Sequence, residues 1–442
     1  MPTFNITGLS GGKTYPIRLR AVTNVQNTSV LSLTSQTFTT IPRVWYSAGV
    51  NEYGIAAVKE TTGSEVQPST IRSHTMCLTA GLLAGSPLLT SESKVFFGYK
   101  CILVLKPDKT LWAMGWNIGG RFGRGASNNN VVYTGFVQIF SNCDDVSLGG
   151  TLTLFVRSGA TWYVAGVDNA GNTLLTHLST GPFYSFTPIA SAFDRIVAGP
   201  NVTFAFRGTT LFARGNNAKG ELGIGITNFI NTNINGMFVV PGSWVDVKPG
   251  DGFTYALSSG GQWHASGENV YGQCSVDSPP TRNTFYGTTN QYIFDFTRCN
   301  FTIQPQTQSL GIANFDKIII SGFFPGVFAL SGKKIFGTGA ANGISPYTNS
   351  LSNSAKIFTQ RLSGEWTDIE FSEAGPLTRN YALFALSANN IWHCFGYSSS
   401  IYGNTSFNPP QLRDNQLGFV PLSAKFSTIR TNEYDDISYG LT

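Results

Sequence analysis

One five-residue pattern recurs along this chain and constrains its fold more than any other feature. The pattern is an apolar residue, a ring-bearing residue, a small residue, a variable residue and a glycine. The unit between successive glycines is about 50 residues long, with insertions in some copies. The seven copies are Trp45–Gly49, Leu111–Gly115, Trp162–Gly166, Leu211–Gly215, Trp263–Gly267, Ile335–Gly339 and Trp392–Gly396.

Two further elements precede the pattern in most copies. The nearer one is a short apolar run, such as Phe204–Phe206 or Leu383–Leu386, and a turn joins it to the pattern as in a β-hairpin. The farther one is an acidic or polar residue followed by a branched apolar residue. Three or four short strands per unit, repeated seven times, predict an all-β fold, a seven-bladed β-propeller. Copies of the farther element include Asp145-Val146, Asp316-Lys317-Ile318, Asp368-Ile369 and Asp436-Ile437.

The two ends of the repeat predict how the ring closes. The sequence finishes just after Asp436-Ile437, and the first copy has no clear upstream element. We therefore expect the C-terminal strand to complete the blade that begins near Thr37–Thr40, so that the N- and C-terminal strands pair. The fixed glycine of each copy predicts a positive φ or a closely packed neighbouring backbone.

Composition agrees with this fold and excludes several classes of function. Only 12% of the residues are charged, against about 25% in typical domains, and 49 glycines supply many turns. The net charge of +5 is spread without a basic run, so we expect no nucleic acid partner. No apolar stretch approaches the roughly 20 residues of a membrane span, and residues 1–5 do not resemble a secretory signal, so no membrane insertion is expected.

Glycine-rich segments that follow the pattern resemble a known repeat. Gly215–Gly225 reads GNNAKGELGIG and Gly115–Gly125 reads GWNIGGRFGRG, while Gly267–Gln273 and Gly49–Gly54 keep the first half. These segments resemble the repeat of the regulator of chromosome condensation family. The resemblance implies a seven-bladed propeller over residues 37–442. It implies no single activity, because members of that family include an exchange factor, inhibitors and light sensors.

A second resemblance concerns the start of the chain. Phe4–Leu9, Thr14–Val22 and Thr37–Thr40 resemble the last third of a fibronectin type III domain. The expected domains are therefore a fibronectin type III-like fragment at 1–36, forming a short β appendage, and the propeller at 37–442. Thr37–Thr40 also fits the hairpin register of the first blade, and we favour that placement.

Few residues suggest chemistry. His264 and His393 occupy the ring position of the repeat, which favours packing over catalysis, and Asp144-Asp145 and Asp435-Asp436 favour turn capping over metal binding. No nucleophile, zinc or phosphate-loop motif is present. We therefore predict no enzyme activity, no catalytic residues, no metal and no cofactor. The six cysteines form no CxxC motif, and free buried thiols are favoured over disulfides.

Two insertions are candidates for recognition. Glu60–Ser93 is rich in Ser, Thr and Leu, and the segment between Gln273 and Gly311 is rich in aromatic residues. Such rings either pack locally or form a binding surface on a rigid scaffold, and both interpretations stay open. We predict binding by the second segment. Its candidate binding residues are Phe285, Tyr286, Tyr292, Phe294, Phe296 and Phe301.

Three classes of function compete. A propeller with a fibronectin-type fragment resembles phage appendages, so the leading prediction is a structural or binding protein of a virion, or of an extracellular surface, within a symmetric assembly. Its partners would be other virion or surface proteins, or a surface glycan. The alternative is an intracellular protein-interaction propeller or exchange-factor-like regulator. An enzyme is the third class, and it would require convergent carboxylates.

Overall fold

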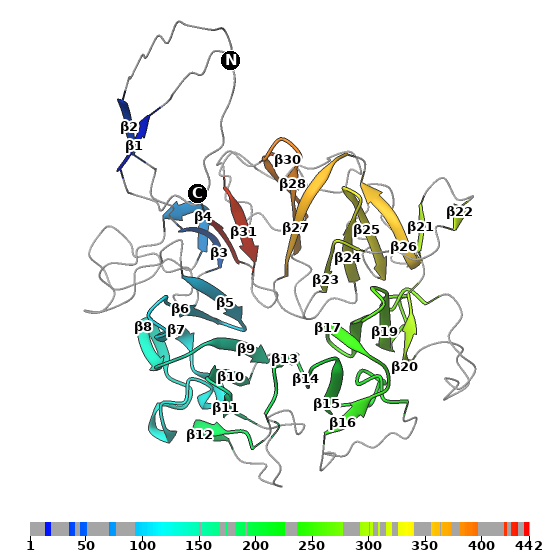
Figure 1. The fold of residues 1–442 in the computed structure, drawn as a ribbon, viewed down its shortest axis with the longest axis horizontal. Coiled ribbons are helices and arrows are strands. Elements are labelled where there is room, and N and C mark those ends of the chain that lie inside the picture. The colour runs from blue at the N-terminus through cyan, green and yellow to red at the C-terminus, as the bar shows by residue number, and fades with distance from the viewer. Residues whose placement is uncertain are drawn as a thin grey trace, which may run out of the picture.

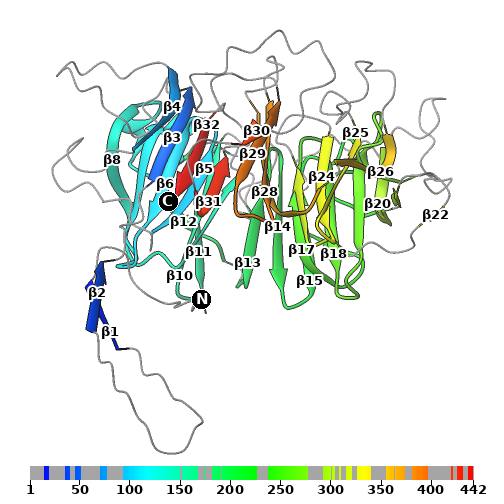
Figure 2. The same cartoon turned by 90° about the horizontal axis from the view of Figure 1, so that it is seen from above.

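Sheets of antiparallel strands stand around a common centre in the computed structural model of the chain (Figure 1). Seen from above, the strands of neighbouring sheets stand side by side (Figure 2). This arrangement confirms the all-β propeller class. The structure describes residues 14–18, 35–39, 45–50, 70–76, 93–149, 152–167, 174, 182–190, 192–225, 237–276, 292–299, 301–303, 308–309, 315–320, 326–339, 355–362, 364–373, 381–396, 420–421, 426–431 and 437–441.

Six sheets have the four-stranded form of a propeller blade. Three of them are β5 (Lys94–Gly98), β6 (Cys101–Leu105), β7 (Leu111–Trp116) and β8 (Val132–Phe140); β9 (Asp145–Gly149), β10 (Thr153–Ser158), β11 (Thr161–Gly166) and β12 (Phe183–Pro188); and β13 (Arg195–Ala198), β14 (Val202–Arg207), β15 (Thr210–Gly215) and β16 (Phe238–Val240). The others are β17 (Trp244–Pro249), β18 (Phe253–Ser258), β19 (Trp263–Glu268) and β20 (Tyr292–Arg298); β27 (Trp366–Glu373), β28 (Tyr381–Ser387), β29 (Trp392–Gly396) and β30 (Val420–Pro421); and β31 (Thr428–Thr431), β32 (Ile437–Leu441), β3 (Trp45–Val50) and β4 (Thr70–Met76). Two short 3-10 helices, η1 (Ile118–Gly120) and η2 (Ala126–Asn128), follow β7.

The remaining repeat lies in a larger sheet, so the prediction of a seven-bladed propeller is corrected to six four-stranded blades among the described residues. This sheet has six strands in the order β22-β21-β26-β25-β24-β23. Its last four strands keep the order of a blade, and β21 extends it by pairing in parallel with β26. Its strands are β21 (Phe301–Ile303), β22 (Gln308–Ser309), β23 (Lys317–Ile320), β24 (Gly326–Ser331), β25 (Lys334–Gly339) and β26 (Ala355–Leu362).

The C-terminal strand closes the ring as the sequence predicts. Residues Ile437 to Leu441 of β32 pair with Gly49 to Trp45 of β3, and β31 pairs with the other side of β32. The two ends of the repeat therefore share one sheet.

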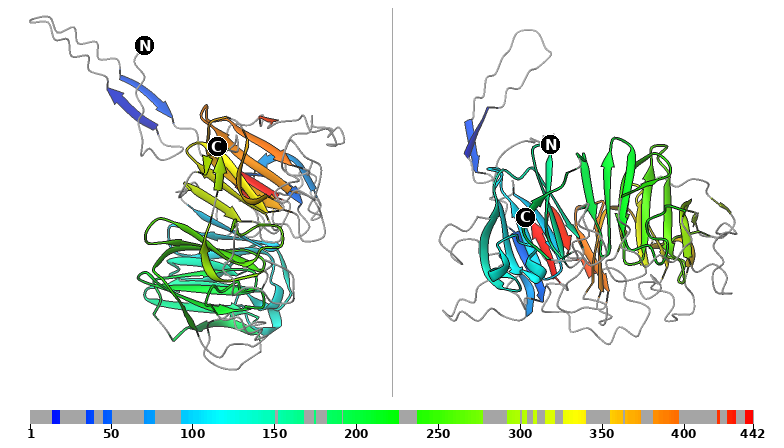
Figure 3. Two further views of the ribbon diagram at one scale, coloured as in Figure 1. Left: turned by 90° about the vertical axis from the view of Figure 1, so that its right-hand side faces the viewer. Right: turned by 90° about the horizontal axis from the view of Figure 1, so that it is seen from below.

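The placement of Thr37–Thr40 in the first blade is wrong. The strand β2 (Ser35–Thr39) spans the expected boundary at residue 36 and pairs with β1 (Thr14–Arg18) in a separate two-stranded sheet. This pair lies beside the ring rather than within it (Figure 3).

The repeat glycines are explained by both of the predicted causes. Those of five copies, Gly115, Gly166, Gly215, Gly267 and Gly339, have positive φ. At Gly215, φ is +127°, and a Cβ would lie 2.7 Å from the Cα of Val202 and would also strike the carbonyl of Asn201. Any other residue would strain the backbone and collide with the start of the neighbouring strand.

The hydrophobic core lies between successive sheets. Phe204 and Leu211 of one sheet pack with Trp244 and Val247 of the next. The same arrangement joins Leu103 and Leu111 to Val146. The second strand of each blade is covered on both sides, so its sequence is a continuous apolar run rather than an alternating one.

Candidate functional site

Loops that follow the third strand of a blade carry the family-like glycine segments. In three of them an asparagine side chain fixes the loop from inside. The Oδ1 atoms of Asn117, Asn217 and Asn269 accept the backbone N–H groups of Phe122, Leu222 and Cys274, at 2.7, 3.0 and 2.9 Å. The asparagine of the repeat is therefore a turn-forming residue, and its side chain is committed to the scaffold.

Two of these loops also reach across to the outer strand of the next sheet. The N–H of Gly225 donates to the carbonyl of Phe294 at 2.9 Å, and that of Gly125 donates to Tyr184 at 2.8 Å. A further bridge joins Ile224 to Asp295. Each loop thus fastens its own sheet to the following one.

This contact changes the interpretation of the aromatic segment. Phe294 is 2% exposed, and the ring of Phe296 lies 5.0 Å from the ring of Trp244. Gly223 packs directly against Phe296, where a Cβ would collide with the ring. The prediction of a free ring is therefore contradicted for Phe294, which is buried between two sheets. Phe296 is partly buried and packs against the core of the preceding sheet, and recognition by its ring stays a prediction.

The other predicted binding residues have different outcomes. Tyr292 lies in β20 and is half-buried. Phe301 lies in β21, of which the structure describes the backbone. Phe285 and Tyr286 fall outside the described residues, as does most of Glu60–Ser93. For these four aromatic residues, recognition stays a prediction.

The packing interpretation of His264 and His393 is confirmed. Their rings stand edge-on to Trp244 and Trp366, with centroids 5.3 and 5.4 Å apart. The Nδ1 atom of His264 lies 3.1 Å from the carbonyl oxygen of Gln262, and burial lowers the pKa of this histidine. Tyr163 and Phe212 make equivalent contacts with Phe140 and Phe193, so the repeat ring has a common structural role.

The turn-capping interpretation of Asp144 is also confirmed. Its carboxylate accepts the N–H of Gly159 at 2.7 Å and the Lys109 ammonium at 2.7 Å. Hydrogen bonds from Lys109 and then from Gly159 lower its pKa. Asp194 and Asp316 hold the hairpin turns of their own sheets in the same way, at Gly208 and Gly332. Asp435-Asp436 lies outside the described residues.

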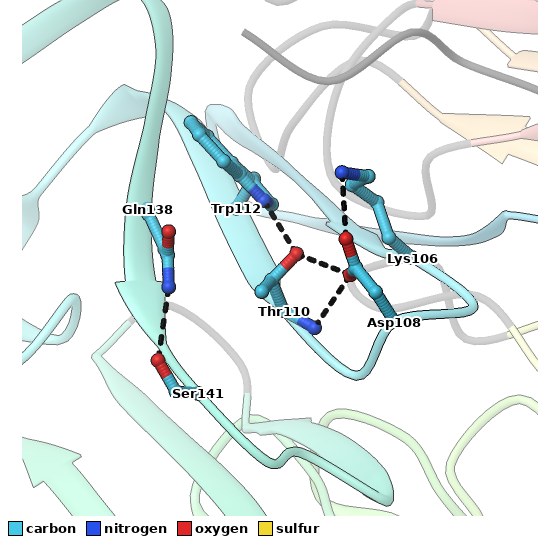
Figure 4. Close-up of polar contacts among 6 residues, drawn as sticks. All are labelled: Lys106, Asp108, Thr110, Trp112, Gln138 and Ser141. Atoms are coloured by element: carbon cyan, nitrogen blue, oxygen red, sulfur yellow. Dashed lines mark hydrogen bonds and ion pairs between the residues drawn. The ribbon is translucent and has the colours of Figure 1, made fainter. Parts of the chain in front are cut away.

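A polar network stiffens the turn between β6 and β7 (Figure 4). Asp108 accepts hydrogen bonds from Lys106 at 2.8 Å and from the hydroxyl of Thr110 at 2.6 Å. These two contacts, the first being the larger, lower the pKa of Asp108 to about 2. Thr110 in turn accepts the indole N–H of Trp112 at 2.9 Å. These hydrogen bonds all join residues within the turn and its two flanking strands, so the network stabilises the conformation of the turn.

A charged cluster joins the sheets β13–β16 and β17–β20. The Lys219 ammonium donates to Glu268 at 2.6 Å, and the Glu221 carboxylate accepts the N–H of Lys219 at 2.7 Å. Glu221 is 2% exposed, and burial raises its pKa to about 7. Burial also raises the pKa of Asp251. Burial by itself would lower the pKa of Lys219, but its hydrogen bond to Glu268 produces a net increase.

Several exposed apolar side chains lie on two of these loops. We call residues 117–132, 216–225 and 269–276 the loop face, because the third strands of the sheets run in one direction and these segments follow their ends. Among the described residues, six large apolar side chains are exposed, and four of them belong to the loop face. These four are Val131 (37%), Val132 (42%), Val270 (43%) and Tyr271 (43%). Sequence reasoning missed them because single exposed valines carry no motif.

Other kinds of site were sought in the described part of the chain. No group of three or more His, Cys, Asp or Glu residues there could hold a metal ion. No helix within it has the length and apolar character needed to cross a membrane. The five cysteines that the structure describes are free, as expected, and Cys77 lies outside the described residues.

These features define a propeller whose repeat residues stabilise the scaffold and whose loop face is exposed. No protein-family profile matches the chain, and no curated protein does. Solved structures do resemble it. Prp20p from Saccharomyces cerevisiae has a TM-score of 0.64 at 12% identity, over 90% of this chain and 91% of that one. Human WBSCR16 has a TM-score of 0.63 at 14% identity, over 90% and 98%.

A second structure of the yeast protein, as RCC1 (Prp20) bound to Kap60, has a TM-score of 0.65 at 12% identity, over 91% of this chain and 89% of that one. The resemblance to an RCC1-like propeller is thus confirmed for the fold, and at such identities it shows the fold alone. Neither the structure nor these comparisons support the fibronectin type III resemblance.

Proposed function

We propose that this chain is a non-enzymatic protein-binding propeller that engages its partner through the loop face. The observation that carries the proposal is the exposure of Val131, Val132, Val270 and Tyr271 on this face. Exposed aromatic and aliphatic residues rimmed by charged groups are typical of protein interfaces. Lys219 of the loop 216–225 forms an ion pair with Glu268, which directly precedes the loop 269–276 of Tyr271.

The comparisons favour an interaction or exchange-factor-like role over a virion component. Prp20p is described with its binding to Gsp1p and histones, and RCC1 (Prp20) is described in complex with Kap60. Propellers of this shape therefore include proteins with protein partners. The location on a virion or an extracellular surface stays a prediction, and its direct test is to look for the chain in purified particles.

The loop face can be tested by placing a charge on it. Tyr271→Asp and Val132→Asp should each abolish co-purification of the partner from source cells while leaving the unfolding midpoint nearly unchanged. Val239→Asp is the matched control, because Val239 is 56% exposed but lies on the outer strand β16. This control should retain the partner.

Quantitative mass spectrometry of the three purifications decides the question. If a stoichiometric partner stays bound to both loop-face variants, the proposal is wrong. Equal loss with Val239→Asp would place the interface on the outer strands instead.

A further inference from the structure

The innermost strands of the sheets carry an alternation of charge. Near the start of each strand, one residue stands directly before a branched apolar residue that pairs with the second strand of the sheet. The sign of that residue changes from every sheet to the next in chain order. The position holds Lys94 in β5, Asp145 in β9, Arg195 in β13, Asp246 in β17, Lys317 in β23, Asp368 in β27 and Thr428 in β31.

Two neighbouring couples form ion pairs across the gap between sheets. Arg195 lies 3.1 Å from the carboxylate of Asp246, and its guanidinium also donates to the carbonyl of Val245 at 2.9 Å. Lys317 lies 2.8 Å from Asp368 and 2.8 Å from Glu370, two residues further along β27. These side chains are about one-third exposed, so water screens them less than a fully exposed pair.

The charges also alternate in sign from one ion-paired couple to the next residue along the ring. Asp145 precedes Arg195 around the ring, and Asp246 precedes Lys317. The inner strands β5 and β9, and β9 and β13, contact each other, so these charges belong to adjoining strands. Lys94 and Asp145 form no ion pair in the described structure, and Asp145 accepts the N–H of Val146 at 2.9 Å.

An odd number of inner strands cannot alternate throughout. Around the ring, the position in β31 falls between that of Asp368 and that of Lys94, so a charge of either sign there would meet a like charge on one side. The residue present is the neutral Thr428. This strand belongs to the sheet that contains both ends of the repeat, which is held by the pairing of β3 with β32.

We propose that the alternating inner-strand charges specify which sheets pack as neighbours, and that the neutral Thr428 marks the seam where the ring closes. The correct order places unlike charges side by side at all junctions except the two that involve Thr428. A misordered ring, or one that incorporates a sheet from a second copy, places like charges together. Repulsion between like charges disfavours these alternatives.

Charge-reversal variants test whether the sign of each inner-strand charge matters, or only the presence of a polar side chain that solvates the strand. Asp246→Arg places a positive charge against Arg195 and Lys248, and should lower the folding equilibrium constant more than Asp246→Asn does, by roughly two- to fivefold. Exchanging the couple, Arg195→Asp with Asp246→Arg, restores that pair but leaves like charges toward Asp145 and Lys317. It should therefore recover only part of the loss. Exchanging all three couples, Lys94 with Asp145, Arg195 with Asp246 and Lys317 with Asp368, restores the order of unlike charges. It should recover most of the loss when Lys248→Glu and Glu370→Lys are added, because Lys248 pairs with Asp246 and Glu370 with Lys317.

The neutral seam has its own test. Thr428→Asp and Thr428→Lys should both lower the urea midpoint relative to Thr428→Ser. The matched control is Glu365→Lys opposite Lys333, an ion pair at 3.2 Å that lies in exposed turns away from the inner strands, where reversal should have little effect.

Two results would overturn the proposal. One is that Asp246→Asn and Asp246→Arg are equally destabilised. The other is that exchanging one couple recovers as much stability as exchanging all three, because the junctions between couples would then carry no specificity.

Discussion

Glu221→Gln should remove the pH dependence that one buried carboxyl group gives to the free energy of unfolding of this protein. Glu221 is 2% exposed, and burial raises its pKa from 4.5 to about 7. Between these two values the folded protein retains a proton that the unfolded chain has lost. The unfolded chain therefore binds fewer protons, and the free energy of unfolding falls as the pH rises through this window.

The size of the effect follows from the shift. At about 1.36 kcal/mol for each pH unit, the ionised form costs the native state about 3 kcal/mol above pH 7. Glutamine removes that cost and keeps the hydrogen bond. This is already seen in the next sheet, where the side-chain oxygen of Gln273 accepts the N–H of Tyr271 at 2.9 Å, as Glu221 does from Lys219. The new amide N–H group is buried without a partner, as in Gln273, and costs about 1 kcal/mol.

The free energies of unfolding of the wild type and of Glu221→Gln should therefore cross as the pH rises. Glu221→Gln is expected to be less stable than the wild type by about 1 kcal/mol near pH 4 and more stable by about 2 kcal/mol near pH 8. Urea unfolding at both pH values measures this. Gln273→Glu is the converse control and should lose stability as the pH rises. The reasoning is refuted if the difference between Glu221→Gln and the wild type does not change with pH, because Lys219 and Asp251 would then compensate for the buried charge.

Three further predictions concern the scaffold. Gly215→Val should cost at least about 3 kcal/mol because its Cβ meets Val202, whereas Gly208→Ala, with positive φ but nothing within 4 Å, should cost about 1 kcal/mol; thermal unfolding that ranks them otherwise would contradict the close-packing argument. Phe294→Ala should lose about 3–5 kcal/mol and Tyr292→Ala clearly less, and similar losses in chemical denaturation would mean that burial does not set the cost. Deleting residues 432–442 removes β32 and leaves the edges of β3 and β31 unpaired, so the protein should aggregate in size-exclusion chromatography; a monomeric, cooperatively unfolding deletion variant would show that the ring does not need this strand.

The sequence alone determined the features that repeat. Glycine, a ring and a small residue recur because every sheet meets the same local geometry, so the fold class, the closing strand and the positive φ at Gly215 could be read from the chain. The same logic placed His264 and His393 in packing positions. A local requirement that recurs in every sheet produces a repeat that can be recognised in the amino-acid sequence.

Only the tertiary structure decided which side chains are free. Phe294 and Phe296 stand in β20, the fourth strand of a blade, and a loop more than 60 residues earlier in the chain crosses to this strand, so Phe294 is buried and Phe296 packs against the loop. Strand β2 pairs with β1 rather than with a blade, and β21 extends one sheet, because pairing depends on which edges meet in space. The alternation of charge on the inner strands likewise matters only once the sheets are arranged in a ring, since Arg195 and Lys317 each meet an aspartate about 50 positions further along the sequence.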